Sequence, residues 1–420
     1  MVQLFLNTVL SCAVAQRATA AVLNLVSQWL PGVAETPCAN AGRMWLLRLG
    51  LYELIREKER ADDWVWIMDH TLQLGPWKCL VIVGVRLSAW TKDRGALHHE
   101  DLTLLNLTPM EKATGERVHA ALLETVAVTG VPRQIVSDGG TDLKKGVELL
   151  HQTHAAVAHM HDIKHKTALL LKQELEHNAE WAAFVTQSNQ SKLGVVQTAL
   201  AFLTPPSLKV KARYMNLDTL VAWGRSTLQY LDQPREISGT EVDLVKLQAK
   251  FGWLSKYRQA LQKWSELLAV AETAESYIRE EGYHRGARQR LSLRLAPLAK
   301  SAGPKRMRTA LLEFVAQESA AARSNRERLI GNSEVLESLI GKYKQLQSTH
   351  SKRGMTAMLL SFGAIVSQKT QDTIYTALNR VRTAEVANWC CKHLGVTLQS
   401  QRKLAFAGNK NGIQTQRSKQ

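Results

Sequence analysis

Two aspartates follow apolar segments of the kind that form buried strands. Asp69 ends the run WVWIMD, and Asp138 ends the run QIVSD. An unpaired buried carboxylate costs several kcal/mol unless something neutralises it, and a divalent cation would do so. Ligands of open α/β sheets bind beyond the carboxyl ends of the strands, so both acids could share one site. Each aspartate alone fits a helix cap or a turn equally well.

A third acid lies far along the chain, in a segment with the apolar spacing of a helix. Its stripe consists of Leu336, Leu339, Ile340 and Tyr343. On another face, Glu337 and Lys344 are seven residues apart, which is two helical turns and roughly 10.5 Å. A carboxylate for a metal ion and a lysine for a phosphate would suit phosphodiester cleavage. An ordinary solvated helix face would show the same pattern.

The aspartates lie in a region, residues 61–180, whose pattern alternates between strands and helices. Three consecutive strands followed by helix-strand repeats predict a mixed α/β sheet covered by helices. The expected strands are 64–69, 79–87, 102–107, 134–138 and 155–162, and the expected helices are 114–129, 141–151 and 163–177.

The flanking regions are expected to be helical. Residues 1–60 form helices around a short glycine-containing turn, and Arg43 and Arg48 lie on the second. This pattern is compatible with a helix-turn-helix DNA reader and equally with a plain helical hairpin. Three further regions complete the prediction: an all-α region at 181–325 with one long amphipathic helix over 244–271, final helices at 326–400, and a basic disordered tail at 401–420.

The charge balance indicates a polyanionic partner. Fifty-four Lys and Arg against 37 Asp and Glu leave +17 over 420 residues, which points to nucleic acid or an anionic surface. A basic surface without a ligand is the alternative. No run approaches the roughly 18 apolar residues of a membrane span. Five cysteines without a CxxC pair suit a reducing compartment. The sequence contains neither a Walker A nor a GxGxxG pattern, so we expect no nucleotide cofactor.

The order of these residues resembles the DDE transposases, which have a ribonuclease H-like fold. An acid ends the first strand and another ends the fourth, and a Glu with a Lys seven residues later follows a helical block. The layout is similar to bacterial insertion-sequence enzymes with a Mutator-like helical insertion, in which a Cys or Asp, two residues and a His follow the fifth strand. Asp162-Ile163-Lys164-His165 occupies that place. Glu334 stands where many members carry Asn, so Glu334 is an alternative to Glu337.

The resemblance implies a catalytic triad of Asp69, Asp138 and Glu337 holding two Mg²⁺ or Mn²⁺ ions. It implies hydrolysis and strand transfer on double-stranded DNA, a homodimer or larger synaptic oligomer, and a place in the bacterial cytosol at the nucleoid. Lys344, Asp162, His165, Arg43 and Arg48 are expected to contact DNA or orient the site.

Three alternatives stay open. They are a decayed or recruited DNA-binding protein of the same fold, a ribonuclease H-like nuclease, and a zinc site. The candidate zinc ligands are His151, His154, His159, His161 and His165. The tryptophans Trp223, Trp253 and Trp264 could stack on an extruded base or pack in a core.

Overall fold

A computed structural model describes residues 1–29, 35–74, 77–93, 97–207, 217–234, 243–348, 355–394, 401–402 and 404–407. The chain divides into two compact units: unit 1 comprises Met1–Met160 with Ser333–Gln420, and unit 2 comprises His161–Asn332. In the expected disordered tail, 401–402 and 404–407 are helical, whereas 403 and 408–420 lie outside the described residues. No described helix has the length and apolar character needed to cross a membrane.

A five-stranded mixed sheet forms the centre of unit 1, which confirms the predicted α/β class. The strand order is β3-β2-β1-β4-β5. Strand β1 pairs antiparallel with β2 and parallel with β4, and β2 pairs antiparallel with β3. The strands are β1 (Trp64–Leu74), β2 (Trp77–Arg86), β3 (Thr103–Met110), β4 (Gln134–Ser137) and β5 (Ala158–His161).

Strand β1 is longer than predicted, because it continues five residues beyond Asp69. The antiparallel ladder with β2 extends as far as the pair Leu74 and Trp77. The parallel ladder with β4 stops at the pair Ile67 and Val136. Asp69 therefore lies just past the end of one of its two ladders rather than at the end of the strand.

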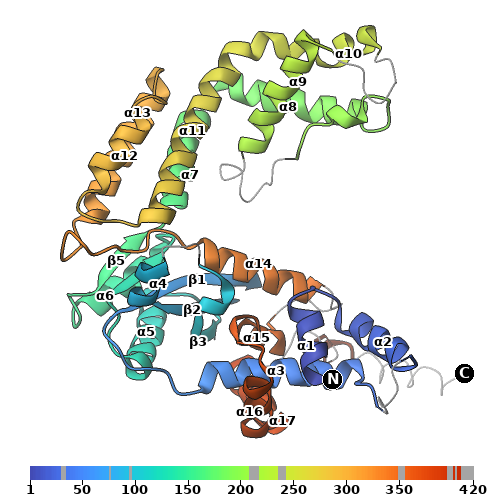
Figure 1. Cartoon of the computed structure of the whole chain (residues 1–420), viewed down its shortest axis with the longest axis vertical. Coiled ribbons are helices and arrows are strands. Elements are labelled where there is room, and N and C mark those ends of the chain that lie inside the picture. Colours follow the sequence, from blue (N-terminus) through green and yellow to red (C-terminus); the bar gives the residue numbers. More distant parts are fainter. Residues whose placement is uncertain are drawn as a thin grey trace, which may run out of the picture. The chain divides into compact units, whose positions relative to one another are not determined.

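Helices cover both faces of the sheet (Figure 1). On one face, Trp64, Trp66 and Met68 form an apolar cluster with residues of α5 (Gly115–Thr129) and α6 (Thr141–His151). The other face carries α14, which contacts β1, and α3 and α15, which contact β3. Their bounds are α14 (Glu334–Ser348), α3 (Ala39–Ile55) and α15 (Ser361–Val366). Strand residues alternate between the faces, so Asp69 belongs to the α14 face.

Helix α3 is the centre of a helical cluster that joins the two ends of the chain (Figure 1). It contacts α1 (Val2–Leu10), α2 (Gln16–Ser27), α15, α16 (Gln371–Arg380) and α17 (Thr383–Leu394). The described short elements of unit 1 are α4 (Leu87–Asp93), η1 (His99–Asp101) and η5 (Ala357–Leu360).

This packing favours the plain helical arrangement, the second of the two interpretations of residues 1–60, over a DNA-reading helix. Arg48 donates from Nε to the Val381 carbonyl at 2.6 Å and also to the Leu378 carbonyl, so it caps the end of α16. Cations at a helix C-terminus satisfy its free carbonyls. Arg43 is half-buried on the same helix.

The described part of unit 2 is almost entirely helical, as predicted. Its elements are α7 (Ile163–Leu175), α8 (Ala179–Val195), η2 (Ala201–Leu203), α9 (Asp218–Asp232), α10 (Leu244–Phe251), η4 (Gly252–Tyr257), α11 (Arg258–Glu281), α12 (Ala287–Leu295) and α13 (Ala302–Ser319). The single long helix expected over 244–271 is wrong, because a 3₁₀ segment separates α10 from α11. Apolar spacing of three and four residues persists through the 3₁₀ segment, so the pattern could not reveal the break.

Aromatic rings pack together around Phe184 in unit 2. Its ring lies 5.1 Å from Trp264, 5.9 Å from Trp253 and 6.5 Å from Trp223 between centroids. The indole nitrogens of Trp223 and Trp253 donate to the Leu203 carbonyl at 2.8 Å and to a serine hydroxyl at 2.9 Å. These contacts support the core-packing interpretation of the three tryptophans rather than stacking on a base.

A buried histidine of unit 2 is held in its neutral form. His284 Nδ1 accepts from the Gly286 backbone N–H at 3.1 Å, and Nε2 lies 2.9 Å from the Tyr277 hydroxyl. Burial, together with the nearby Arg328 and Arg290, lowers the pKa of His284 to about 4 against the opposing effect of a glutamate. Protonation at Nδ1 would remove the bond from Gly286.

We expect the stability of unit 2 to fall as the pH drops from about 6.5 to about 4. The folded-state pKa of His284 is lower than the unfolded value, so the unfolded chain binds more protons in this window. The loss is on the order of 3 kcal/mol once the pH is below 4. Thermal unfolding from pH 7 to pH 4 should therefore show a smaller loss of Tm in His284→Asn than in the wild type. Equal losses would contradict the assignment.

Candidate functional site

The register of two parallel strands brings Asp69 and Asp138 to the same level. Strand β1 pairs with β4 through Trp66 and Ile135, then Ile67 and Val136. Continued for two residues, this register sets Asp69 beside Asp138. Neighbouring strands lie about 4.8 Å apart, and paired residues point to the same face. The continued register therefore sets the two acids predicted from the sequence at the same level, just past the end of the ladder between β1 and β4.

A tight glycine turn fixes the loop that carries Asp138. Asp138 Oδ1 accepts from the Gly140 backbone N–H at 2.9 Å. Gly139 has φ +81°, a conformation that favours glycine. A Cβ at Gly140 would lie 3.2 Å from carboxylate oxygens of both Asp138 and Asp142. Helix α6 begins directly afterwards, so the Asp138 carboxylate is held in the turn between β4 and α6.

A second polar cluster joins this loop to β1 and β2. His70 Nε2 lies 3.0 Å from Asp142 Oδ2, and Lys78 Nζ lies 3.3 Å from the same oxygen. Burial lowers the pKa of His70 and outweighs the opposing effect of Asp142. Sequence reasoning missed this cluster. The available signals were a histidine directly after Asp69 and an acid in the first turn after Gly139-Gly140.

Helix α14 crosses the face of the sheet that carries Asp69. Tyr343 is fully buried and stacks on Phe362 with ring centroids 4.5 Å apart. Burial raises the pKa of Tyr343, and the thiol of Cys79 adds to the effect, so Tyr343 lies near Cys79. Cys79 pairs with Thr71 of β1, two residues from Asp69 and on the same face.

Glu337 and Lys344 both lie on α14, as the helical spacing of this segment predicted. Glu337 lies in the first turn of the helix, together with Glu334, and is half-buried. Acids in a first turn also favour the positive end of the helix dipole, so this position alone does not make either a ligand. Lys344 is exposed one residue after buried Tyr343. Because α14 contacts β1, it brings the third predicted acid to the face of Asp69.

The residues expected to orient the site or contact DNA, Asp162 and His165, lie at the start of α7 in unit 2. Asp162 is 1% exposed and caps α7, where its Oδ1 accepts from the Lys164 N–H at 2.6 Å. His165 is half-buried, and its Nδ1 lies 3.9 Å from the same oxygen. The buried Asp162 carboxylate therefore serves as a helix cap.

Other candidate ligands have separate surroundings. His159 Nε2 lies 2.9 Å from the Ser137 hydroxyl, and His161 Nδ1 lies 3.1 Å from Glu318 Oε1. Within the described ranges, the five histidines considered as zinc ligands do not gather into a group of three.

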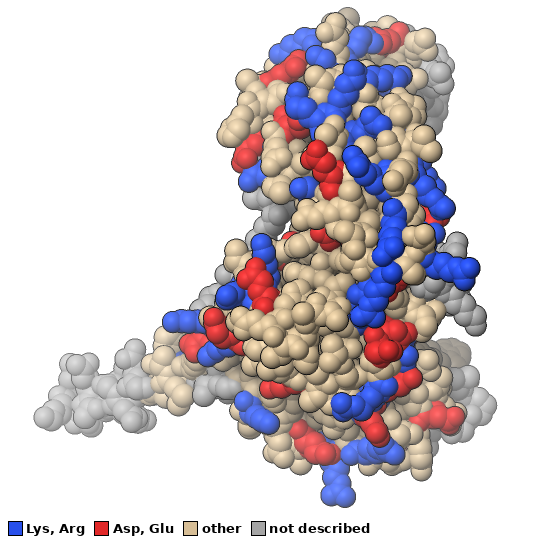
Figure 2. All heavy atoms as spheres, turned by 90° about the vertical axis from the view of Figure 1, so that its left-hand side faces the viewer, with Lys and Arg blue, Asp and Glu red and all other residues tan. Residues whose placement is uncertain are grey.

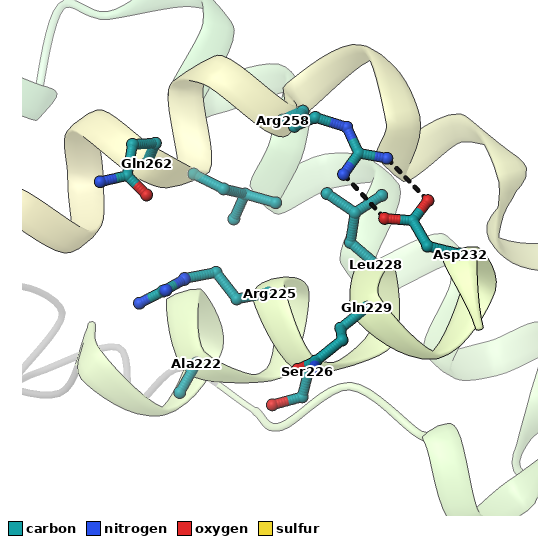
Figure 3. A pocket seen from close by; sticks show the side chains of 9 residues that line it. Ala222, Arg225, Ser226, Leu228, Gln229, Asp232, Arg258 and Gln262 are labelled. Carbon is teal, nitrogen blue, oxygen red and sulfur yellow. Dashed lines mark hydrogen bonds and ion pairs between the residues drawn. The ribbon is translucent and has the colours of Figure 1, made fainter. Parts of the chain in front are cut away.

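Unit 2 has a polar cavity of about 600 Å³ between α9 and α11 (Figure 3). Asp232 and Arg258 face each other there in a bidentate ion pair, with oxygen–nitrogen distances of 2.7 and 2.8 Å. Arg225 donates to the Ser265 hydroxyl at 2.6 Å. Because its acid and one of its two arginines neutralise each other, we assign no ligand to this cavity.

Comparison with known proteins gives no family assignment. No protein-family model matches the chain, and no curated protein matches it significantly.

Proposed function

We propose that the chain is a metal-dependent DNA transposase of the DDE type, with a ribonuclease H-like core. The strand order β3-β2-β1-β4-β5 supports the proposal, since three antiparallel strands, with the fourth strand parallel to β1 on its other side, agree with that fold. On this proposal, unit 2 is the helical insertion between Asp138 and Glu337. Its helical composition and its place in the chain agree with that role.

One observation carries the proposal: the parallel register of β1 and β4, continued by two residues, sets Asp69 level with Asp138, and α14, which carries Glu337, contacts β1. An ordinary helix cap or turn would explain either aspartate alone. A cap or a turn would not explain why three acids far apart in the sequence come to the same part of the sheet. It would also not explain the lysine two turns after the acid on α14.

The donor set fits hard divalent cations. Asp69, Asp138 and Glu337, which all belong to unit 1, would hold Mg²⁺ or Mn²⁺. Two such ions, when bound, activate the attacking oxygen and stabilise the leaving oxygen of a phosphodiester. The protein's own share is to position carboxylates on a rigid sheet, with Lys344 available for a DNA phosphate.

The proposed partner is double-stranded DNA, in agreement with the net charge of +17. A homodimer or synaptic oligomer and a location at the bacterial nucleoid belong to the same proposal. The second candidate is a DNA-binding protein of this fold without catalysis, which the same basic charge favours.

The deciding experiment incubates the full chain with the DNA ends that flank its coding region, in Mg²⁺, in Mn²⁺ and in EDTA. We expect nicking at the ends and joining to target DNA with either metal and none in EDTA. Cutting without joining would favour a nuclease. Binding without cutting would contradict the enzyme proposal and leave the non-catalytic binder.

A further inference from the structure

A continuous stretch of unit 2 carries almost all of its excess positive charge. Between 285 and 308 the sequence has eight Lys and Arg and no Asp or Glu. The whole of unit 2 has 26 Lys and Arg against 17 Asp and Glu, an excess of nine. This stretch forms α12, the turn after it and the first part of α13. We call it the basic hairpin; its charged residues are Arg285, Arg288, Arg290, Arg294, Lys300, Lys305, Arg306 and Arg308.

The charges of the basic hairpin are turned to solvent. Seven of the eight are exposed, and Arg308 is half-buried. Figure 2 views the side on which α12 and α13 lie in Figure 1, and Lys and Arg side chains form a band along it. Within the described chain, Arg288, Lys300 and Lys305 form no ion pair, so their charges are available to a partner.

The other five cations of the hairpin have partners within unit 2. Arg306 makes a bidentate pair with Glu174 of α7, at 2.6 and 2.9 Å. Arg308 links α13 to α12 by donating to the Ser292 hydroxyl at 2.8 Å, and Arg285 donates to carbonyls beyond the end of α13. Arg290 and Arg294 lie 4.0 and 3.9 Å from two glutamates of α11. These contacts fix the hairpin within unit 2, so the exposed cations stand on a fixed scaffold.

The apolar side of the hairpin is used inside unit 2. Leu291, Leu295, Met307 and Leu311 are at most 2% exposed, and α13 also contacts α11 and α7. One large apolar side chain, Leu293, is strongly exposed at 78%. A protein-binding surface would require an apolar centre, which one leucine does not provide. A stretch of exposed cations that contains no acid of its own is suited instead to rows of phosphates.

We propose that the basic hairpin binds the phosphate backbone of double-stranded DNA, apart from the carboxylate site. The inference rests on the proposed function, because it makes unit 2 the part that holds the DNA being cut. Such contacts add affinity and position the duplex, and they carry no sequence information. Arg288, Lys300 and Lys305 are the residues that contact phosphates.

The test compares two triple variants of the full chain with equal loss of charge. The first is Arg288→Gln, Lys300→Gln, Lys305→Gln. The control removes three exposed lysines of α10 and α11 in the same unit: Lys246→Gln, Lys250→Gln, Lys263→Gln. Binding to a fluorescent DNA duplex of arbitrary sequence is measured by anisotropy in EDTA over a series of salt concentrations.

We expect the hairpin variant to lose at least about tenfold in affinity at roughly 0.1 M salt. The slope of log K against log salt should become shallower by about 2 to 3, since each phosphate contact contributes about 0.9. The control should change the slope by less than about 1. Equal effects of the two variants would show a diffuse effect of net charge and overturn the assignment, as would no effect of the hairpin variant.

The readout separates this inference from the proposed function. Binding in EDTA requires no cleavage, so a chain that never cuts DNA can still confirm the hairpin. If the proposed enzyme is active, the hairpin variant should cut saturating DNA at the wild-type rate with a raised KM. The inference would be overturned if the hairpin variant bound DNA with wild-type affinity but lost its affinity for phosphatidylserine vesicles. That result would indicate that the hairpin binds a membrane surface.

Discussion

Asp138→Asn should abolish metal-dependent DNA cleavage while leaving the protein folded. Asparagine keeps the size of the side chain and the acceptor oxygen that binds the Gly140 N–H. It removes the negative charge that the continued register of β1 and β4 sets level with Asp69. Metal ions contribute several kcal/mol to such reactions, so cleavage should fall by roughly a thousandfold or more. Gel assays of strand cleavage in Mg²⁺ and Mn²⁺ measure the loss.

Matched variants make this result specific. Asp69→Asn and Glu337→Gln should lose cleavage activity to the same extent as Asp138→Asn. Asp62 is an exposed aspartate of the same unit, and Asp62→Asn should keep full activity. Affinity for Mn²⁺, measured by titration calorimetry, should drop in the first three only. If Glu334→Gln is inactive and Glu337→Gln is active, the third metal ligand is Glu334, one helical turn before Glu337. Full activity of Asp138→Asn would contradict the site.

The layout of the sheet could be predicted because strand formation depends on local apolar runs. Helices α5 and α6 begin and end within one residue of the predicted bounds, since Gly130 and the turn at Gly139-Gly140 end one segment and start the next. Strand β1 was predicted too short, because residues 70–74 are partly polar. They are strand only because β2 pairs with them, and this contact is absent from the local pattern.

The acids of the candidate site could be predicted from the sequence, but the residues that surround them could not. Acids that follow apolar runs can be recognised one at a time. The cluster of His70, Asp142 and Lys78 depends on three segments meeting, and no spacing along the chain encodes that meeting. Arg48 illustrates the same dependence on long-range contacts. A basic residue on a helix suggests DNA binding, yet its partners are carbonyls more than 300 residues away.

The contact between α3 and α15 explains why the two ends of the chain fold together. A Cβ at Gly50 of α3 would lie 1.8 Å from the Leu360 carbonyl oxygen, and one at Gly363 of α15 would lie 2.4 Å from the Gly50 carbonyl oxygen. Two backbones thus touch where neither residue has a side chain. Backbone atoms cannot rotate away as a side chain can, so any larger residue must push the helices apart.

Gly50→Ala should therefore destabilise unit 1 by about 3 kcal/mol or more, the upper range for overpacking a core. For a unit of this size, about 2–4 °C of Tm is lost per kcal/mol, so calorimetry should show unit 1 melting roughly 6–12 °C lower. The transition of unit 2 should stay unchanged.

Gly341→Ala in α14 is the matched control, because it meets nothing within 4 Å. It should raise the stability by about 0.5–1 kcal/mol, the usual preference for alanine within a helix. The two substitutions add the same methyl group to a helix of the same unit, so their opposite signs measure the contact and not helix propensity. A mild effect at Gly50 would mean that α3 and α15 do not meet backbone to backbone, and the joining of the chain ends would need another cause.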